Sequence, residues 1–372
     1  MDRRNPITIL NVVGARPNFM KIAPLLAAFR ARPEVRPLLV HTGQHYDERM
    51  SDLFFRQLGI PQPDINLEVG SGSHGSQTAE IMKHFEPVVA DCRPDAVLVV
   101  GDVNSTIACA LVAVKMGVPV AHVEAGLRSF DRSMPEEINR LLTDAISEWL
   151  FVTEPSAVAN LRREGVAEEK IYFVGNVMID TLRANLEKAS AGTALRDLGL
   201  KPRGYAVLTL HRAANVDDRE ILGRLFEAIG AIARDMPIVF PVHPRSRKNM
   251  AAFGMIDGEG SAMGGLRMVE PLGYLDFLQL MAEARLVLTD SGGIQEETTI
   301  LKIPCLTLRE TTERPVTVEV GCNQIVGTDP DRILAAYRRI MAAKTFTCGV
   351  PEKWDGHAAE RIADTLVVAL VA

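Results

Sequence analysis

The stretch AVLVVGDVNSTIACALVAVKM, residues 96–116, decides the fold. Its first five residues are apolar and mostly β-branched, which is typical of a strand buried on both faces of a parallel sheet. Gly101 and Asp102 follow directly, and Ser105–Met116 then has the spacing of an amphipathic helix. We therefore predict a strand–turn–helix unit of a doubly wound sheet, with Asn104 or Ser105 capping the helix.

The same alternation of short apolar runs and helical segments extends through almost the whole chain. Its 372 residues exceed what one hydrophobic core usually organises. We predict an α/β fold of two Rossmann-like domains, residues 1–178 and 179–356, linked near a polar stretch at 176–204, with a helix at 357–372 that packs back on the first. The predicted strands are Ile7–Val13, Pro37–His41, Ala96–Val100, Val118–Val123, Leu150–Thr153 and Ile171–Val174, then Ala206–Leu210, Ile238–Val242, Arg267–Val269, Leu286–Thr289, Pro304–Leu308 and Gln324–Val326.

Composition limits the classes of function. With 41 Lys and Arg against 47 Asp and Glu, the net charge is -6, and no long basic run favours a nucleic-acid partner. The apolar runs are too short to span a bilayer, and Arg16 interrupts the N-terminal one, so we expect no membrane segment, no signal peptide and a cytoplasmic location. Five scattered cysteines without CxxC spacing predict reduced thiols rather than a disulfide or zinc framework.

Chemically active side chains gather where the predicted strands of the first half end. Ligands of parallel sheets bind beyond the carboxyl ends of the strands, so a cleft between the two domains is the expected site. The residues are Arg16 and Lys21 after the first strand, Asp102 after the third, Glu124 on the same strand face as His122, and Glu136 with Glu137 behind Pro135. The cations predict an anion site, and the acids predict general acid and base groups. The alternatives are surface cations, a turn-stabilising Asp102 and a solvated acidic pair at a helix start.

The second half contributes histidines and a glycine-rich helix start. His211 and His243 each follow a predicted strand. Ser291-Gly292-Gly293 opens a helix whose free amides can bind phosphate oxygens, and Glu297, one turn later, is placed to accept hydrogen bonds from a diol such as a ribose. Arg314 adds a cation near another strand end. The alternative is a glycine-rich cap followed by surface acids.

Metal binding is the competing explanation for so many histidines and acids. No HExxH or other compact ligand spacing is present, so we predict no metal site.

Taken in order, a series of strings in this chain resembles the non-hydrolysing UDP-N-acetylglucosamine 2-epimerases. Each string alone is weak evidence, but their ordered combination is specific and covers nearly the whole chain. The strings are GARPNFMKIAPL, TGQHYDERM, VVGDVNSTIACALVA, HVEAGLRSFDRSMPEEINR, VGNVMID, LTLHRAANVD, PVHPRS, TDSGGIQEET and RETTERPVTVEVG.

The resemblance implies a GT-B-like fold of two Rossmann-like domains that close over a nucleotide sugar. It implies interconversion of UDP-N-acetylglucosamine and UDP-N-acetylmannosamine without NAD or another cofactor, generally by a homodimer. The implied route eliminates UDP across C1–C2 to give 2-acetamidoglucal and then adds UDP back after a proton returns on the other face of the sugar.

The resemblance also implies roles for individual residues. Three carboxylates would handle proton transfer and the cationic sugar, and His211 would act in catalysis or beside the phosphates. The carboxylates are Asp102, Glu124 and Glu136; the implied phosphate and sugar ligands are Arg16, Lys21, Ser291, Gly292 and Arg314, with Gly293 in the same helix start; and Glu297 is the implied ribose ligand.

The chain departs from the family in one stretch. Some bacterial members bind a second, regulatory UDP-N-acetylglucosamine through a Gln-His-x-Gln stretch and a later Arg. Here Asp47 replaces the second Gln, and the stretch 70–75 has no matching Arg. This departure argues against activation by substrate, and it leaves Gln44 and His243 as candidates for a remnant of that site.

Other functions compete with this interpretation. A 2-epimerase of a modified sugar, such as a UDP-2,3-diacetamido hexuronate, would share the nucleotide motifs. A hydrolysing epimerase would release free sugar and UDP. A retaining GT-B glycosyltransferase would not require the acids of the first half, and a non-catalytic sensor would not require all of them to be present.

Overall fold

A computed structural model describes residues 6–43, 57–256, 264–343 and 345–371, and of Arg16 only the backbone. The contacts divide the chain into two compact units. The N-terminal unit consists of Met1–Ala184 with Glu352–Ala372, and the C-terminal unit consists of Asn185–Pro351. The domain limits at 178 and 356 stay a prediction, because a division by contacts does not test how the domains fold.

The N-terminal unit is built on a parallel sheet with the strand order β3-β2-β1-β4-β5-β6-β7. Its central strand β4 consists of five apolar residues that are all buried, because helices cover both faces of the sheet. The strands are β1 Ile7–Val13, β2 Val35–His41, β3 Ile65–Asn66, β4 Ala96–Val100, β5 Val120–Ala125, β6 Trp149–Val152 and β7 Ile171–Phe173.

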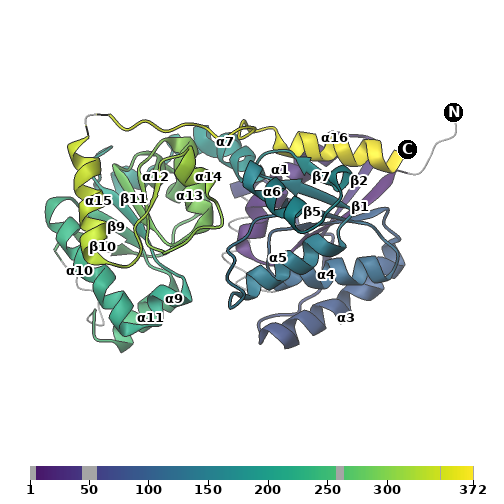
Figure 1. Ribbon diagram of the computed structural model, residues 1–372, viewed down its shortest axis with the longest axis horizontal. Helices are drawn as coiled ribbons and strands as arrows, with labels where there is room; N and C mark the ends of the chain where they lie inside the picture. Colours follow the sequence, from purple (N-terminus) through teal and green to yellow (C-terminus); the bar gives the residue numbers. More distant parts are fainter. Residues whose placement is uncertain (1–5, 44–56, 257–263, 344, 372) are drawn as a thin grey trace. The chain divides into compact units, whose positions relative to one another are not determined.

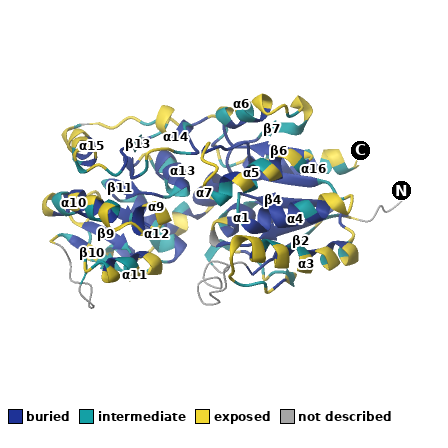
Figure 2. Ribbon diagram, turned by 60° about the horizontal axis from the view of Figure 1, so that its bottom comes forward, coloured by how far each residue is buried: buried dark blue, intermediate teal, exposed yellow. Residues whose placement is uncertain are grey.

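Helices cover the two faces of this sheet in two groups. On one face α3, α4 and α5 pack side by side, and on the other α1 packs against α16 (Figure 1). The outer faces of these helices are largely exposed, while the strands are buried (Figure 2). The helices are α1 Arg16–Arg30, α3 His74–Cys92, α4 Asn104–Lys115, α5 Pro135–Ile146, α6 Pro155–Arg163, the 3₁₀ helix η1 Glu168–Lys170, α7 Val177–Ser190 and α16 Ala358–Val371.

The C-terminal unit repeats this plan with the order β10-β9-β8-β11-β12-β13, again parallel. Its core joins these strands to α10 and α15, which pack against each other. The strands are β8 Ala206–Thr209, β9 Ile238–Pro241, β10 Leu266–Val269, β11 Leu286–Thr289, β12 Cys305–Thr307 and β13 Asn323–Ile325. The helices are α8 Ala194–Asp197, α9 Ala213–Val216, α10 Arg219–Asp235, α11 Pro244–Ala252, α12 Tyr274–Ala282, α13 Gly292–Leu301, α14 Val316–Glu319 and α15 Pro330–Ala342.

The doubly wound α/β fold is confirmed, but the prediction of the helix cap is wrong. The helix after β4 is preceded by Val103, and neither Asn104 nor Ser105 caps it. Asn104 instead donates to Gln77 at 2.8 Å, and the Ser105 hydroxyl lies 2.8 Å from that of Thr42. The polar stretch 176–204 contains α7 and α8.

The prediction of five reduced thiols is wrong for one pair. Cys322 and Cys348 are joined by a disulfide, while Cys92, Cys109 and Cys305 are free. The spacing of 26 positions gives no signal of this pairing. It arises because the chain after α15 runs back past β13.

The last helix belongs to the N-terminal unit. The carboxylate of Asp180 accepts hydrogen bonds from the first amides of α16, those of Ala358 and Ala359, at 3.2 and 2.7 Å. Ile362 and Leu366 on its inner face are fully buried. In the described part of the chain, no helix has the length and apolar character needed to cross a membrane.

Candidate active site

Several of the predicted residues follow the strands that flank the switch points of the two sheets. In the N-terminal sheet the strand order reverses between β1 and β4, and in the C-terminal sheet between β8 and β11. Helices diverge to opposite faces at such points, which leaves a crevice beyond the strand ends. Asp102 follows β4, and His211 and Ser291 follow β8 and β11.

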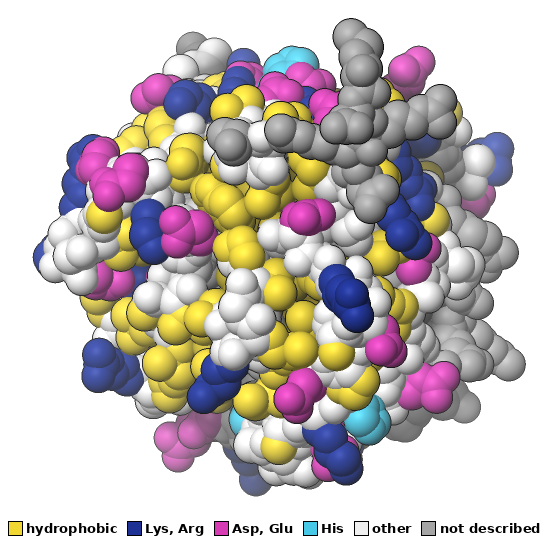
Figure 3. Space-filling model, turned by 90° about the vertical axis from the view of Figure 1, so that its right-hand side faces the viewer, with side chains coloured by type: hydrophobic (Ala, Val, Ile, Leu, Met, Phe, Trp, Pro, Cys, Tyr) yellow, Lys and Arg dark blue, Asp and Glu magenta, His cyan; other side chains and the backbone are white. Residues whose placement is uncertain are grey.

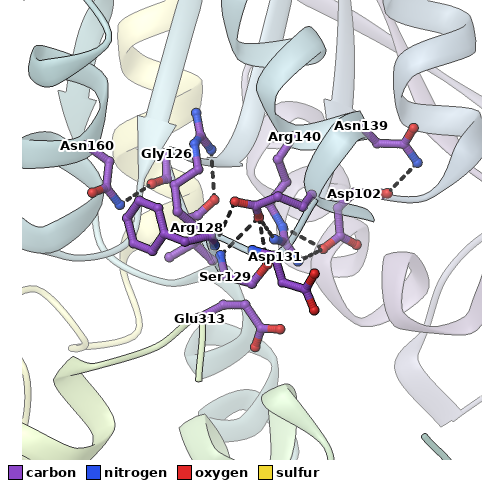
Figure 4. A network of polar contacts seen from close by, with 12 residues as sticks. Asp102, Gly126, Arg128, Ser129, Asp131, Asn139, Arg140, Asn160 and Glu313 are labelled. Carbon is purple, nitrogen blue, oxygen red and sulfur yellow. Dashed lines mark hydrogen bonds and ion pairs between the residues drawn. The ribbon is translucent and has the colours of Figure 1, made fainter. Parts of the chain in front are cut away.

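Asp102 is fixed at both its backbone and its side chain. Arg140 of α5 donates from Nε to Asp102 Oδ2 at 3.0 Å, and Asn139 of the same helix donates to the Asp102 carbonyl at 2.9 Å (Figure 4). The Asp102 side chain is still 29% exposed, so it can meet a ligand. One helix therefore both orients this carboxylate and places a cation beside it.

Glu124 has an unusual backbone conformation. Its φ is 75°, and the pairing of β5 with β6 shifts register between Val123 and Ala125. This bulge breaks the regular alternation of the strand, so the prediction from alternation that His122 and Glu124 share one face does not hold as argued. The Glu124 carboxylate forms a buried ion pair with Lys21 of α1.

Gly101 is the point at which these groups meet. A Cβ at position 101 would lie 2.9 Å from Lys21 Nζ and 3.4 Å from Glu124 Oε2, and Gly101 has a φ of 68°. Only glycine satisfies both the conformation and the close approach. The structure thus brings Lys21, Asp102 and Glu124 together.

The two acids that open α5 have different surroundings. Glu137 is buried and accepts hydrogen bonds from the amides of Ser129 and Phe130, both at 2.9 Å, and it also pairs with Arg140. Glu136 is half-buried and precedes Asn139 and Arg140 by three and four positions. Residues so spaced share one helix face. Glu137 therefore holds the loop before α5, and Glu136 remains the candidate for chemistry.

Sequence reasoning missed a buried network behind these residues. His122, which is fully buried, bonds to Asp144 of α5 and to the Gly101 carbonyl. Asp144 also contacts Arg128, whose guanidinium makes two hydrogen bonds with Glu164 at 2.8 and 2.7 Å. The HVEAGLR string contains two of these residues, but their partners come from distant helices.

In the C-terminal unit His211 is oriented by a second missed residue, Asp290. Nδ1 of His211 lies 3.1 Å from Asp290 Oδ1, and the His211 ring is 41% exposed. Asp290 is fully buried and accepts hydrogen bonds from the amides of His211 and Arg212. Burial alone would raise the pKa of Asp290, but these hydrogen bonds and His211 hold the pKa below its ordinary value. The ring of His243 lies 6.3 Å from that of His211.

The start of α13 combines free amides with a guanidinium. Ser291 is the residue before the helix, and its side chain makes no capping bond. A Cβ at Gly292 would lie 2.7 Å from Arg314 Nη1, so glycine lets Arg314 reach this turn beside Gly293. Arg314 is held by Glu296 at 2.5 Å. The first-turn amides have no partner inside the helix, so the site suits an anion.

Glu297 lies one turn further along α13. It is 3% exposed and accepts a hydrogen bond from the Tyr274 hydroxyl at 3.1 Å. Burial raises the pKa of Glu297 to about 8; nearby Glu296 also raises it, while Tyr274 opposes the shift. The carboxyl group can therefore change its charge near neutral pH.

Some predicted residues lie outside what the structure describes. The side chain of Arg16 does, as do Gln44 and Asp47. Among the described residues, no group of three or more His, Cys, Asp or Glu side chains is arranged to hold a metal ion.

These features define a class: a two-unit α/β protein with carboxylates at the ends of two adjacent strands of one sheet and groups suited to an anion at the switch point of the other. Residues 27–367 match the UDP-N-acetylglucosamine 2-epimerase family. The chain belongs to that family.

Individual relatives agree with this assignment. A UDP-N-acetylglucosamine 2-epimerase of Methanocaldococcus jannaschii is 45% identical over 338 residues, which are 90% of this chain and 92% of that protein. A UDP-2,3-diacetamido-2,3-dideoxy-D-glucuronate 2-epimerase of Pseudomonas aeruginosa is 41% identical over 363 residues, 96% and 98% of the two chains. The crystal structure of the M. jannaschii UDP-GlcNAc 2-epimerase with UDP-GlcNAc and UDP has a TM-score of 0.90, 43% identity, and coverage of 97% of this chain and 100% of that one.

Proposed function

We propose that this chain is an isomerase that interconverts UDP-N-acetylglucosamine and UDP-N-acetylmannosamine by inverting C2 of the sugar. One observation carries the proposal: in a member of this family, Asp102 and Glu124 end adjacent strands, and each is paired with a cation. The M. jannaschii relative that bears this activity in its name supports the same substrate.

The proposed chemistry begins with the weak acidity of the C2 proton. A base alone would remove it slowly, so loss of UDP from C1 has to develop positive charge on the sugar, which nearby carboxylates stabilise. The base takes the C2 proton, the C1–O bond breaks with its electron pair on UDP, and 2-acetamidoglucal forms. A proton then reaches C2 from the opposite face, and UDP bonds to C1 again. Asp102, Glu124 and Glu136 are the proposed carboxylates.

The C-terminal unit would supply the donors that receive the departing pyrophosphate. His211, Arg314 and the amides from Ser291 to Gly293 are suited to its growing negative charge. Glu297 would bind the ribose hydroxyls. We assign the remaining predicted ligands, Arg16, Lys21 and His243, to the sugar and phosphates by their positions in the family strings.

A second substrate is favoured by the P. aeruginosa relative. That protein is named for UDP-2,3-diacetamido-2,3-dideoxy-D-glucuronate and is 41% identical over 96% of this chain. The same elimination and re-addition would invert C2 of that sugar, since the nucleotide and the C1–C2 bond are alike.

The deciding experiment incubates the purified protein with each UDP-sugar in D2O and follows the mixture by NMR. We expect deuterium at C2, both epimers at equilibrium and UDP still attached, with UDP-N-acetylglucosamine turned over faster than the hexuronate. The reverse order would make the hexuronate the substrate. Complete release of UDP and free sugar would indicate hydrolysis, and reaction only after an acceptor is added would indicate a glycosyltransferase.

We also propose that the protein is a homodimer in the cytoplasm, as the family resemblance implies. Apolar side chains gather on the outer face of the N-terminal unit (Figure 3). Among the exposed large apolar side chains of this unit are Val114 of α4 and Ile138 and Leu142 of α5, which are 38%, 45% and 51% exposed. Large exposed apolar patches mark interfaces. Light scattering should give a mass twice that of the 40.7 kDa chain, and Leu142→Glu should lower the measured mass. Cell fractionation tests the cytoplasmic location.

A further inference from the structure

His122 has two hydrogen-bond partners, and the first requires a donor. The side chain is fully buried in β5. Its Nε2 lies 2.8 Å from the carbonyl oxygen of Gly101. A carbonyl oxygen can only accept, so Nε2 carries a proton.

The second partner, Asp144, also acts as an acceptor. Nδ1 of His122 lies 2.6 Å from Asp144 Oδ1. The other oxygen, Oδ2, accepts from the Gly126 amide at 3.0 Å and from Arg128 Nη2 at 2.7 Å. Because Arg128 makes a charge-assisted hydrogen bond to it, Asp144 is a carboxylate, and Nδ1 must donate to it.

Charge balance leads to the same state. The network holds two acids, and Arg128 bonds to both; Asp144 is buried, whereas the side chain of Glu164 is 33% exposed. A protonated ring makes the four-residue network neutral.

We propose that His122 is an imidazolium at neutral pH and acts as a positioning residue for Asp102. Its Nε2–H holds the Gly101 carbonyl, while Asn139 holds the carbonyl of Asp102. The turn between β4 and α4 is thus fixed at two successive peptide groups, and the Asp102 carboxylate is aimed by the backbone as well as by Arg140. The role of Asp102 in proton transfer depends on the proposed function, but the proposed charge of His122 does not.

The charge is measured on protein with ¹⁵N-labelled histidine, by two-bond ¹H–¹⁵N correlation at neutral pH. Loss of one set of signals in His122→Asn assigns the ring. We expect both ring nitrogens to resonate as protonated nitrogens. A single unprotonated nitrogen would mean a neutral ring with the proton on Asp144, and it would overturn the proposal.

Positioning is measured without turnover, by amide hydrogen exchange of the peptide that covers residues 97–106. In His122→Asn the shorter amide can still reach Asp144 but not the Gly101 carbonyl, and we expect exchange to rise at least tenfold. His122→Gln can donate to that carbonyl and should restore most of the protection. His84→Asn is the matched control, because Nδ1 of His84 lies 3.1 Å from the carbonyl of Leu67 on a partly exposed side chain.

Kinetics then separates this idea from the proposed function. We expect His122→Asn to lower kcat at least tenfold with KM within about twofold, His122→Gln to recover part of it, and His84→Asn to match the wild type. Equal loss in the Asn and Gln variants, or unchanged exchange at 97–106, would rule out positioning. A wild-type protein that epimerises no UDP-sugar would refute the proposed function, and the NMR and exchange results would still decide the state of His122.

Discussion

At the scale of single residues, Glu124 shows how the backbone serves the site. A non-glycine residue at a φ of 75° costs roughly 1–3 kcal/mol, and such strain persists only where surrounding contacts fix it. Here the ion pair with Lys21 and the β5 bulge supply those contacts. The strain therefore aims the Glu124 carboxylate at the turn that carries Asp102.

The three carboxylates give the first prediction. Asp102→Asn, Glu124→Gln and Glu136→Gln should each lower turnover about a hundredfold or more, because each removes a group for proton transfer or charge stabilisation. UDP binding, measured by calorimetry, should stay within a fewfold of the wild type. Glu124→Gln places a neutral amide beside buried Lys21 and can destabilise the fold, so the thermal unfolding of this variant is measured in parallel. Near-normal turnover in all three would contradict the assignment.

Glu297 gives a prediction about protons. With a pKa of about 8, raised by burial, it is mostly protonated at pH 7. Hydrogen bonds donated by ribose hydroxyls favour the carboxylate, so UDP binding at pH 7 should release up to about one proton. Calorimetry in two buffers of different ionisation enthalpy measures this release. Glu297→Gln should abolish it and weaken binding, and a wild type that binds UDP with no proton release would exclude the ribose contact.

At the scale of elements, the first turn of helix α13, rather than the whole helix, provides the amides of the proposed anion site. Its starting amides and Arg314 are brought together because residue 292 has no side chain. Amides that point to an anion, with a guanidinium beside them, need no movement when the ligand arrives. The proposed phosphate site of the C-terminal unit is therefore preformed.

Gly292→Ala tests that site. The added methyl group would lie 2.7 Å from Arg314 Nη1, so the guanidinium must move. We expect UDP affinity to fall about tenfold or more, the value of one charge-assisted hydrogen bond. Gly230→Ala in α10 is the control, since nothing lies within 4 Å of its added Cβ and alanine favours a helix. Equal affinity in both variants would remove Arg314 from the phosphate site.

The sequence predicts elements where local pattern decides them and fails where distant contacts do. β1, β4 and β11 match their predicted bounds because continuous apolar runs identify buried parallel strands. β3 escapes prediction because its two residues are a strand only through pairing with β2. α7 had a usable signal, since Ile179 and Leu182 have helical spacing and are buried, but the polar residues around them hid it.

The candidate site residues divide in the same way, into those that local sequence marks and those that only distant contacts reveal. Asp102 and His211 follow strand ends, so topology alone marks them. Asp290 also follows a strand end, but its pairing with His211 comes from another strand, and no local feature of the sequence identifies Asp144 as the partner of His122. The bulge at Glu124 also needs the backbone, because alternation along β5 predicts a regular strand. Spacing thus finds the groups that meet a ligand more readily than those that orient them.

At the scale of the whole molecule, the chain builds its first unit from both of its ends. After the C-terminal unit it returns at Glu352, and α16 then packs on α1 and β1. Trp354 donates to the Thr153 carbonyl at 2.9 Å, and Arg32 of the α1 end bonds to Asp364 at 3.1 Å. Stability of the carboxylate-bearing unit thus depends on residues more than 300 positions away from β1.

This dependence gives the last prediction. Leu366 of α16 and Leu278 of α12 are both fully buried leucines, one in each unit. Replacing either by alanine should cost about 2–5 kcal/mol of unfolding free energy, from lost burial and the cavity left behind. Hydrogen exchange should locate the damage: Leu366→Ala should raise exchange in peptides of β1 and α1 and spare those of β8 and β9, and Leu278→Ala should do the opposite. The same exchange pattern in both variants would mean that the two units unfold as one, and that the return of the chain does not stabilise the N-terminal unit separately.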